Sequence, residues 1–372
     1  HQADIAVLYN AEAEWSGESM TVQKVTRELT EQQFEFDILS LEMIETAQLK
    51  QPGNFCVNHH PFKVLIVPYA QRLPFHFINQ LITLHKHGVK IFFIDQLFDG
   101  ASEQVDSQSQ KEYLQKEACI TTLSKLARSL KALNTNQLAT KQEHPYLRYF
   151  HYKHDHQSVY MLFNENSYEA MQATVQFVEQ KQLCQYDPHT NEVYQLQDDN
   201  GWYTFDFEPS EAIFLFENTT LPSRKLEKLT QTKSLSKQAW NIQIANQSIE
   251  KEPHTDTLPV LGLGDAFEDY AGTITYETTF SSLNGPVVLE IADASEIVSV
   301  YLNEQFIDTR ISQPYHFELS HALQAGDNHL KIEVTNNLGR QMRDYLSQFI
   351  LMEPLGILGD VQLKYGDFAT HA

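Results

Sequence analysis

The stretch FKVLIVPYAQRLPFHFINQLITLHKHGVKIFFID, residues 62–95, sets the fold class of the first part of the chain. Its two ends, 62–69 and 89–95, are short apolar runs rich in β-branched and aromatic residues, as buried parallel strands are. Between them, apolar residues recur at helical spacing, and a proline and a glycine stand where a helix begins and ends. These residues are Phe75, Ile78, Leu81 and Ile82, with Pro74 before them and Gly88 after them. The order strand, helix, strand predicts two parallel strands connected by a helix.

The same alternation extends over the first third of the chain. Two more apolar runs, 5–9 and 34–39, precede the quoted stretch, and an amphipathic run at 111–133 follows it. The last run is interpreted as one long helix with four apolar residues along one side: Leu114, Leu123, Ala127 and Leu130. An open parallel sheet covered by helices is therefore predicted for residues 1–140.

Beyond residue 140 the period of the apolar pattern changes to two. Segments such as YLRYFHY, SVYMLFNE, ATVQFVE, NEVYQLQ, WYTFDFE and EAIFLFE are separated by turn residues, which predicts a β-sandwich over residues 141–220. A polar, Lys-rich stretch then predicts a linker at 221–250, although AWNIQI within it is expected to pair with the following sheet. Residues 251–372 carry six more strand-like segments and predict a second all-β domain.

Composition limits the classes of partner. The chain has 372 residues and a formal charge of −22, from 49 acidic and 27 basic side chains, which argues against nucleic-acid and anionic-membrane partners. No apolar run approaches the roughly 20 residues of a membrane span, and no signal-peptide pattern is present. The three cysteines are widely separated, so neither a disulfide framework nor a zinc site is indicated and a cytoplasmic location is expected. A chain that begins with His and runs at once into a strand is expected to be a piece of something longer.

The C-terminal segments carry a resemblance to a known class of domain. DYAGTITYETTF, SVYLNEQFID, PYHFELSHALQAGDNHLKIEVTNN and PLGILGDVQL, in this order, resemble the galactose-binding-like jelly roll that accompanies glycoside hydrolase barrels, including those of family 2. Upstream, VYMLFNEN and YDPHTNEVYQL are similar to the middle β-sandwich of large bacterial enzymes of the family 106 rhamnosidase type. The N-terminal part resembles the flavodoxin-type, glutamine-amidotransferase-like domain of family 42 β-galactosidases.

The resemblance implies a multi-domain α/β plus all-β architecture. An amidotransferase-like parallel-sheet domain is followed by two β-sandwich domains, and the catalytic barrel of such enzymes lies N-terminal to all of them. It further implies carbohydrate as the ligand, the barrel as a partner, and a homo-oligomer.

No catalytic residue, cofactor or metal is predicted within this chain. A barrel of eight βα units needs about 250 residues, whereas the alternating pattern supplies only four strands. An amidotransferase nucleophile should sit on a tight turn after a strand with a histidine partner. Here Cys56 is expected before its strand and Cys119 inside a helix.

The stretch after the first strand supplies one candidate site, formed by Glu12, Glu14 and Trp15. Ligands of open α/β sheets collect beyond the carboxyl ends of the strands, and this predicted loop lies there. The three residues are interpreted as a site shared with the barrel or with a partner subunit. Two alternatives stay open: a catalytic pair of carboxylates, and a polar loop in which residues 16–18 begin a helix.

A second candidate site lies in the final domain, where VTNNLGRQMRDYL follows a strand. Its polar side chains suit sugar hydroxyls: Asn336, Asn337, Arg340, Arg343 and Asp344. The alternative is that the domain only braces the barrel. His154 and His156 in HYKHDH are expected on one face of a strand, but two nitrogens do not make a metal site.

Three hypotheses follow. The favoured one is a non-catalytic C-terminal portion of a glycoside hydrolase that supports oligomerisation and substrate access. The second is an autonomous carbohydrate-binding protein. The third is a hydrolase in which Glu12 and Glu14 act as acid and base.

Overall fold

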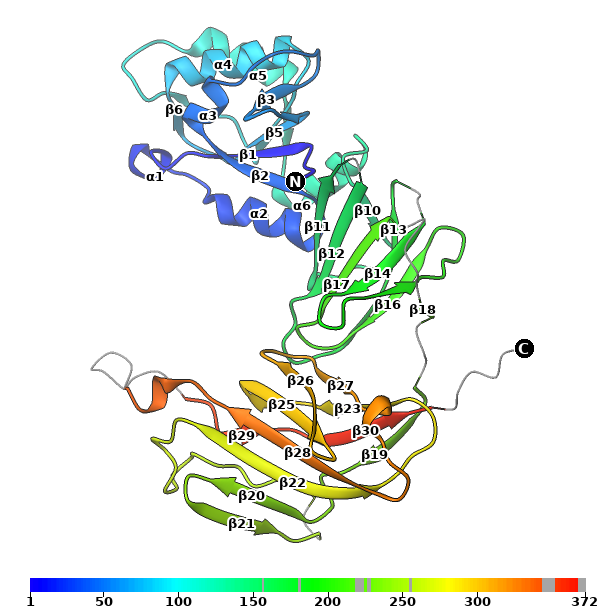
Figure 1. Ribbon diagram of the computed structural model, residues 1–372. Helices are drawn as coiled ribbons and strands as arrows, with labels where there is room; N and C mark the ends of the chain where they lie inside the picture. The colour runs from blue at the N-terminus through cyan, green and yellow to red at the C-terminus, as the bar shows by residue number, and fades with distance from the viewer. Residues whose placement is uncertain are drawn as a thin grey trace. The chain divides into compact units, whose positions relative to one another are not determined.

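The chain divides into two compact units, His1–Lys225 and Leu226–Ala372. The computed structural model, drawn in Figure 1, describes residues 1–155, 157–179, 182–217, 224–225, 229–253, 256–342 and 352–366. Each unit contains its own hydrophobic core. No helix among these described residues is both long and apolar enough to cross a membrane.

A five-stranded parallel sheet forms the first part of unit 1. Its strands, in spatial order, are β2 (Phe36–Ser40), β1 (Ile5–Tyr9), β5 (Val64–Val67), β7 (Lys90–Ile94) and β9 (Cys119–Thr121). Every neighbouring pair is parallel. Counted along the chain, the strand order is 2-1-3-4-5, the order of flavodoxin-like doubly wound sheets. The predicted open parallel sheet is thereby found, with one strand more than expected.

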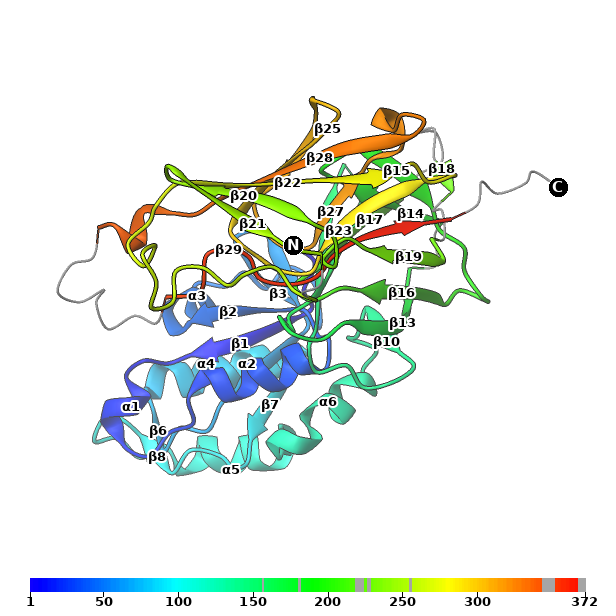
Figure 2. The ribbon, with the colours of Figure 1, turned by 90° about the horizontal axis from the view of Figure 1, so that it is seen from below.

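Helices cover both faces of this sheet, as can be followed in Figure 2. On one face, α2 (Val22–Glu31) and α6 (Leu123–Lys131) pack on one set of alternating strand residues that includes Val7 and Ile66. On the other face, α3 (Leu41–Glu45), α4 (Phe75–Lys86) and α5 (Gln108–Glu117) pack on the opposite set, which includes Leu8 and Leu65. Because both faces are covered, the central strands β1, β5 and β7 are buried on both sides and read as continuous apolar runs.

The helix predicted from the quoted stretch is confirmed as α4. It follows Pro74 and ends before His87, and Gly88 then adopts a φ of +98°. A Cβ at Gly88 would lie 3.2 Å from the backbone nitrogen of Gly53, so both the conformation and the close approach favour glycine there.

The single helix predicted over 111–133 is wrong. The chain leaves α5 at Glu117, forms the short edge strand β9, and starts α6 at Leu123. Thr122 has extended backbone angles and separates β9 from α6. The run Cys119–Thr121 pairs with β7, and this tertiary pairing overrides the helical spacing of the flanking leucines.

The second part of unit 1 is a β-sandwich. One sheet contains β10 (Leu138–Thr140), β13 (Met171–Phe177) and β16 (Tyr203–Phe207). The other contains, in spatial order, β11 (Leu147–His154), β12 (Gln157–Asn164), β17 (Ala212–Glu217), β14 (Leu183–Asp187), β15 (Glu192–Gln195) and β18 (Arg224–Lys225). The period-two pattern predicted these strands because alternate residues, such as Tyr160 and Leu162, are buried between the sheets. The sandwich begins at Leu138, since β10 pairs with β13.

A polar joint connects the α/β part of unit 1 to the sandwich. Gln33 lies just after α2, has a φ of +55° and is 5% exposed. Its Nε2 donates to the carbonyl oxygens of His144 at 2.8 Å and Leu147 at 3.0 Å. The backbone nitrogen of Gln2 also donates to the carbonyl of His151 on the edge strand β11, at 2.9 Å. The joint therefore fixes the entry into β11 to the end of α2.

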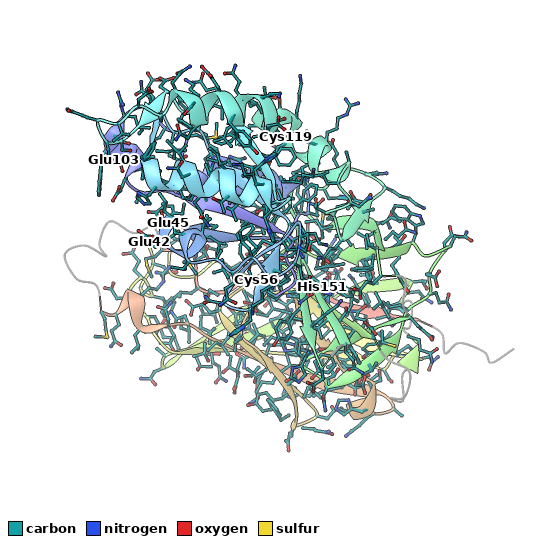
Figure 3. All side chains as sticks on the ribbon, turned by 90° about the horizontal axis from the view of Figure 1, so that it is seen from above. Glu42, Glu45, Cys56, Glu103, Cys119 and His151 are labelled. Carbon is teal, nitrogen blue, oxygen red and sulfur yellow. The ribbon has the colours of Figure 1, made fainter. Side chains whose placement is uncertain are left out.

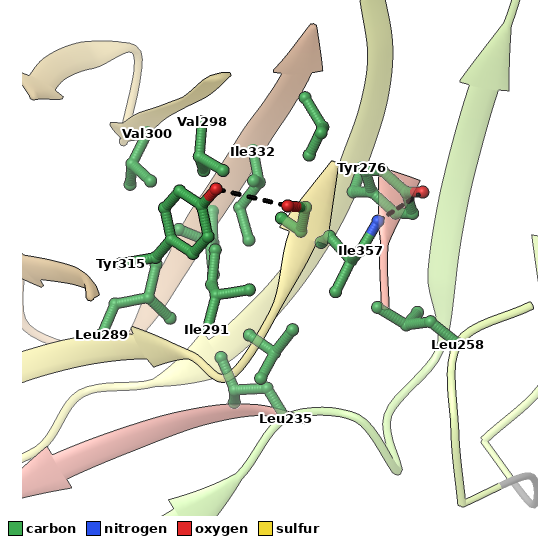
Figure 4. Packing of buried hydrophobic residues seen from close by; sticks show 14 of the residues in the cluster. Leu235, Leu258, Tyr276, Leu289, Ile291, Val298, Val300, Tyr315, Ile332 and Ile357 are labelled. Carbon is green, nitrogen blue, oxygen red and sulfur yellow. Dashed lines mark hydrogen bonds between the residues drawn. The ribbon is translucent and has the colours of Figure 1, made fainter. Parts of the chain in front are cut away.

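Unit 2 is a sandwich of two antiparallel sheets. The four-stranded sheet contains, in spatial order, β19 (Gln231–Ser234), β30 (Val361–Tyr365), β23 (Val287–Ile291) and β27 (Tyr315–Glu318). The six-stranded sheet contains β21 (Gln247–Lys251), β20 (Trp240–Ile244), β22 (Thr273–Ser281), β28 (Asp327–Thr335), β25 (Ile297–Leu302) and β26 (Gln305–Arg310). In the core between them, the Tyr276 hydroxyl accepts the Ile357 amide at 3.1 Å, as Figure 4 shows.

Short elements complete both units. In unit 1 these are α1 (Ala13–Ser16) and the pairs β3 (Phe55–Val57) with β4 (His60–Phe62) and β6 (Arg72–Leu73) with β8 (Gly100–Ala101). In unit 2 they are the pair β24 (Ala294–Ser295) with β29 (Gly356–Ile357), and the turns η1 (Ser320–Ala322) and η2 (Leu338–Arg340).

The linker predicted at 221–250 is wrong over most of its described length. β19, β20 and nearly all of β21 fall within it, and all three are strands of unit 2. The expected pairing of AWNIQI is confirmed, because β20 pairs with β22. Trp240, Ile242 and Ile244 face the core, while the intervening polar residues made the stretch resemble a linker.

Candidate functional site

Glu12, Glu14 and Trp15 follow β1 at the carboxyl edge of the parallel sheet, as predicted. They do not form an open loop, because α1 spans Ala13–Ser16 and the Glu12 carbonyl accepts the amides of Trp15 and Ser16, both at 3.1 Å. The helix start expected at residues 16–18 is also wrong: Gly17, with φ +151°, ends α1, and the next helix begins at Val22. The indole of Trp15 is 85% exposed.

The loops that follow β1 and β5 are hydrogen-bonded to each other. Met20 donates its amide to the Tyr69 carbonyl at 2.7 Å, and the Gln71 amide donates to the Glu18 carbonyl at 2.7 Å. The Glu18 amide in turn donates to Gln71 Oε1 at 3.1 Å. In a 2-1-3-4-5 sheet, ligands bind between these two loops, at the point where the strand order reverses. Here the chain spans that point with its own hydrogen bonds.

The nucleophile of an amidotransferase has no counterpart at this edge. The residues after β5 are Pro68, Tyr69 and Ala70. Cys56 precedes the parallel strand β5, as expected, and lies within β3, whereas Cys119 lies within β9 and not inside a helix. Figure 3 labels both cysteines. Neither cysteine sits on a tight turn after a parallel strand, so the geometry for nucleophilic catalysis is not formed by either.

Glu45, His76 and Glu103 form a polar group at the start of α4 that was not predicted from the sequence. Glu103 Oε2 accepts the Phe75 amide at 2.8 Å, and this bond lowers the pKa of Glu103. His76 Nε2 lies 2.6 Å from Glu45 Oε1, and its Nδ1 lies 3.8 Å from Glu103 Oε1. Figure 3 labels both glutamates. A carboxylate at a helix N-terminus stabilises the helix, so Glu103 serves as a cap of α4.

The predicted sugar-binding residues of unit 2 make hydrogen bonds within the chain. Asn336 Oδ1 accepts the Gly272 amide at 2.8 Å, and its Nδ2 donates to the Tyr270 carbonyl at 2.9 Å. Asn337 Oδ1 accepts the Gly339 amide at 2.6 Å and caps η2. Both asparagines therefore hold loops together, and a sugar would have to compete with these bonds.

Arg340 is buried, with 3% of its surface exposed. Its Nη1 donates to the carbonyls of Gly262 at 3.0 Å and Glu268 at 2.8 Å, and its Nη2 donates to the Glu353 carbonyl. The guanidinium thus connects three loop segments at one end of the sandwich. Arg343 and Asp344 lie outside the described residues.

We predict that Arg340→Met lowers the free energy of unfolding of unit 2 by roughly 3 kcal/mol, because one buried and two partly buried carbonyls lose a charged donor. Urea unfolding followed by circular dichroism measures this loss. Lys237→Met, at a side chain 66% exposed, is the control and should change stability by less than about 0.5 kcal/mol. Unchanged stability together with lost sugar binding would instead favour a direct ligand role for Arg340.

Of the two histidines expected on one strand face in HYKHDH, the structure describes only His154. β11 ends at His154, and Asp155 adopts a φ of +46° in the turn to β12. His156 lies outside the described residues. Within either unit taken alone, the part of the chain that the structure describes brings no three His, Cys, Asp or Glu side chains together as metal ligands.

A pocket lies between the α/β part and the sandwich of unit 1. His1 Nδ1 lies 2.9 Å from Asp37 Oδ1, and its Nε2 contacts Glu35 Oε2. The imidazole stacks on Phe150 of β11, with ring centroids 4.9 Å apart and planes 4° from parallel. Thr30, Gln33 and Tyr149 complete the wall next to these groups. Sequence interpretation missed this site because the contacting residues are 34 or more positions apart.

The carboxylates set the charge of the imidazole. Hydrogen bonds to Asp37 and Glu35 raise the pKa of His1 to about 9, against the effect of burial. The bond from His1 lowers the pKa of Asp37, whereas burial raises the pKa of Glu35. Asp37 is therefore the main counter-ion of an imidazolium that is charged at neutral pH.

We predict that the stabilisation contributed by His1 depends on pH. Because its pKa is raised on folding, the contribution is complete below about 6.5, the ordinary pKa of histidine, and is lost as pH rises through about 9. The difference in unfolding free energy between the natural chain and His1→Ala, measured from pH 6 to 10, should shrink over that interval. A difference that stays constant with pH would contradict a charged imidazole.

Comparisons with known proteins give a fold and no family. No family model matches the sequence, and no curated protein matches it. Among solved structures, a rhamnosidase from Novosphingobium sp. PP1Y matches 97% of this chain with a TM-score of 0.68 and 15% identity, and the chain spans 39% of that rhamnosidase. A β-glucuronidase from Ruminococcus gnavus matches 36% of this chain at 17% identity and a TM-score of 0.30, with 29% of its own chain covered. The rhamnosidase likeness shows a shared fold; the glucuronidase match is too weak to carry an argument.

Proposed function

We propose that this chain is a non-catalytic, C-terminal portion of a glycoside hydrolase. It supports assembly and substrate access for a catalytic barrel that precedes it. The observation that carries the proposal is the likeness to a rhamnosidase over 97% of this chain, of which the chain spans 39%. The proposed role is carried over from the rhamnosidase by analogy of fold.

The residues at the carboxyl edge of the parallel sheet support a non-catalytic role. Glycosidases need two carboxylates facing each other across the bond to be cleaved. Glu12 and Glu14 are exposed, two positions apart on the first turn of a four-residue helix, and neither lines the unit 1 pocket. The neighbouring loops bond to each other where a ligand would enter.

The partners proposed are a carbohydrate, the barrel of the same parent chain, and a second copy of the protein. Trp15, 85% exposed beside two carboxylates, is suited to an interface with the barrel or with that second copy. Three free cysteines agree with a cytoplasmic location. The alternative function, an autonomous carbohydrate-binding protein, is favoured by the jelly-roll resemblance of unit 2.

Hydrolysis of aryl glycosides tests the proposal. A panel including α-L-rhamnosides and β-D-galactosides is assayed with this chain and with a longer protein that contains it. Turnover is expected from the longer protein alone, because the reacting carboxylates lie outside this chain.

Turnover by this chain alone, lost in Glu14→Gln without unfolding, would overturn the proposal and establish the hydrolase hypothesis. Saturable sugar binding, with no turnover by the longer protein, would favour the autonomous binding protein.

A further inference from the structure

The imidazole of His1 occupies a socket formed by Glu35, Asp37 and Phe150. One edge of the ring faces Asp37 Oδ1, at 2.9 Å from Nδ1, and the other edge faces Glu35 through Nε2. The Phe150 ring covers a face of the imidazole in nearly parallel stacking, at 4.9 Å between centroids. Two acceptors in the ring plane and one aromatic surface against it suit a planar cation with N–H groups on two edges.

The carboxylate of Glu35 is built into this socket. Glu35 is 8% exposed, and the imidazole of His1 and the backbone of His151 both face its carboxylate. The hydroxyl of Tyr149, which lines the same pocket, is buried and has no hydrogen-bond partner among the described residues. Burying such groups is costly, and a carboxylate in this setting is stabilised chiefly by a cation held against it. With the imidazole removed, Glu35 would lose its charged partner.

The socket takes its walls from both parts of unit 1. Glu35 and Asp37 lie at the beginning of β2 in the α/β part, whereas Phe150 and Tyr149 lie on β11 of the sandwich. With His1 in place, a cavity of about 460 Å³ remains beside the socket, lined by these residues and by His1 itself. Any group that fills the socket therefore touches both parts and holds them together.

We propose that Glu35, Asp37 and Phe150 form a binding site for a planar nitrogen cation, imidazolium or guanidinium, which His1 fills in this chain. A bound cation closes the joint between the α/β part and the sandwich. An external ligand of the same class, such as an arginine side chain of a partner, fits the site when His1 is withdrawn. The proposal rests on the atoms of the socket and not on the proposed function.

Chemical rescue tests this site in the full chain. His1→Ala empties the socket, and the thermal midpoint of unit 1 is followed at pH 6.5 while imidazole or methylguanidinium is added. Pyrazole, a neutral ring of the same size and shape as imidazole, is the matched probe that lacks the charge. The natural chain, whose socket is filled, controls for general effects of the additives.

Both cations should raise the midpoint of His1→Ala in a saturable way, and should leave the natural chain nearly unchanged. Pyrazole should have less than a tenth of the effect. The response should disappear when Glu35→Gln and Asp37→Asn are added to His1→Ala, and should weaken severalfold with Phe150→Leu. His59→Ala, at an exposed histidine of the same unit, should show no rescue.

Equal effects of imidazole and pyrazole would overturn the proposal, because stacking alone would then explain the contact. The same shift in the natural chain as in His1→Ala would overturn it also, as would rescue that persists without both carboxylates.

Discussion

A buried amide, the side chain of Gln33, holds the first unit together. Its Nε2 donates to the carbonyl of His144, which precedes the edge strand β11, and to that of Leu147, the first residue of β11. Without it, two backbone carbonyls at the start of the sandwich would each lose one hydrogen bond, and two bonds of about 0.5–1.5 kcal/mol each amount to about 1–3 kcal/mol. The position of β11 determines where Phe150 and Tyr149 meet β2, so the His1 socket depends on the same joint. A parallel sheet and a sandwich that each have their own core are thereby combined into one unit.

The polar residues of both units serve structure more than chemistry. At the carboxyl edge of the parallel sheet, the loops after β1 and β5 bond to each other at the point where doubly wound proteins bind ligands. At one end of unit 2, Arg340 connects three loop segments through their carbonyls. This pattern agrees with the supporting role proposed above. The exposed Trp15 and the His1 socket are two features of the described residues that are available for contact.

Local patterns predicted the strands well, and long-range contacts account for most errors. The alternation of buried residues in β12 and β22 is visible in the sequence because a sandwich strand has one inner face. The strand β9 was hidden, since Cys119–Thr121 is short and its neighbours have helical spacing; only its pairing with β7 reveals it. The polar residues of 221–250 concealed β19 and β21, whereas the three core residues of β20 made its pairing predictable. For the sites, residue chemistry selected Arg340 but could not show that backbone carbonyls already occupy its guanidinium. His1 and Glu35 meet only through folding.

Hydrogen exchange of backbone amides in the full chain most directly tests the claim that unit 1 is a single body. Core amides of β5 and of β12 should open with the same free energy, and Gln33→Ala should lower both by a similar amount, about 1–3 kcal/mol. Gln23→Ala, at an exposed position of α2, is the matched control and should change neither. If Gln33→Ala lowers protection in only one of the two parts, or the two parts open with different free energies in the natural chain, they are separate bodies and the account is contradicted.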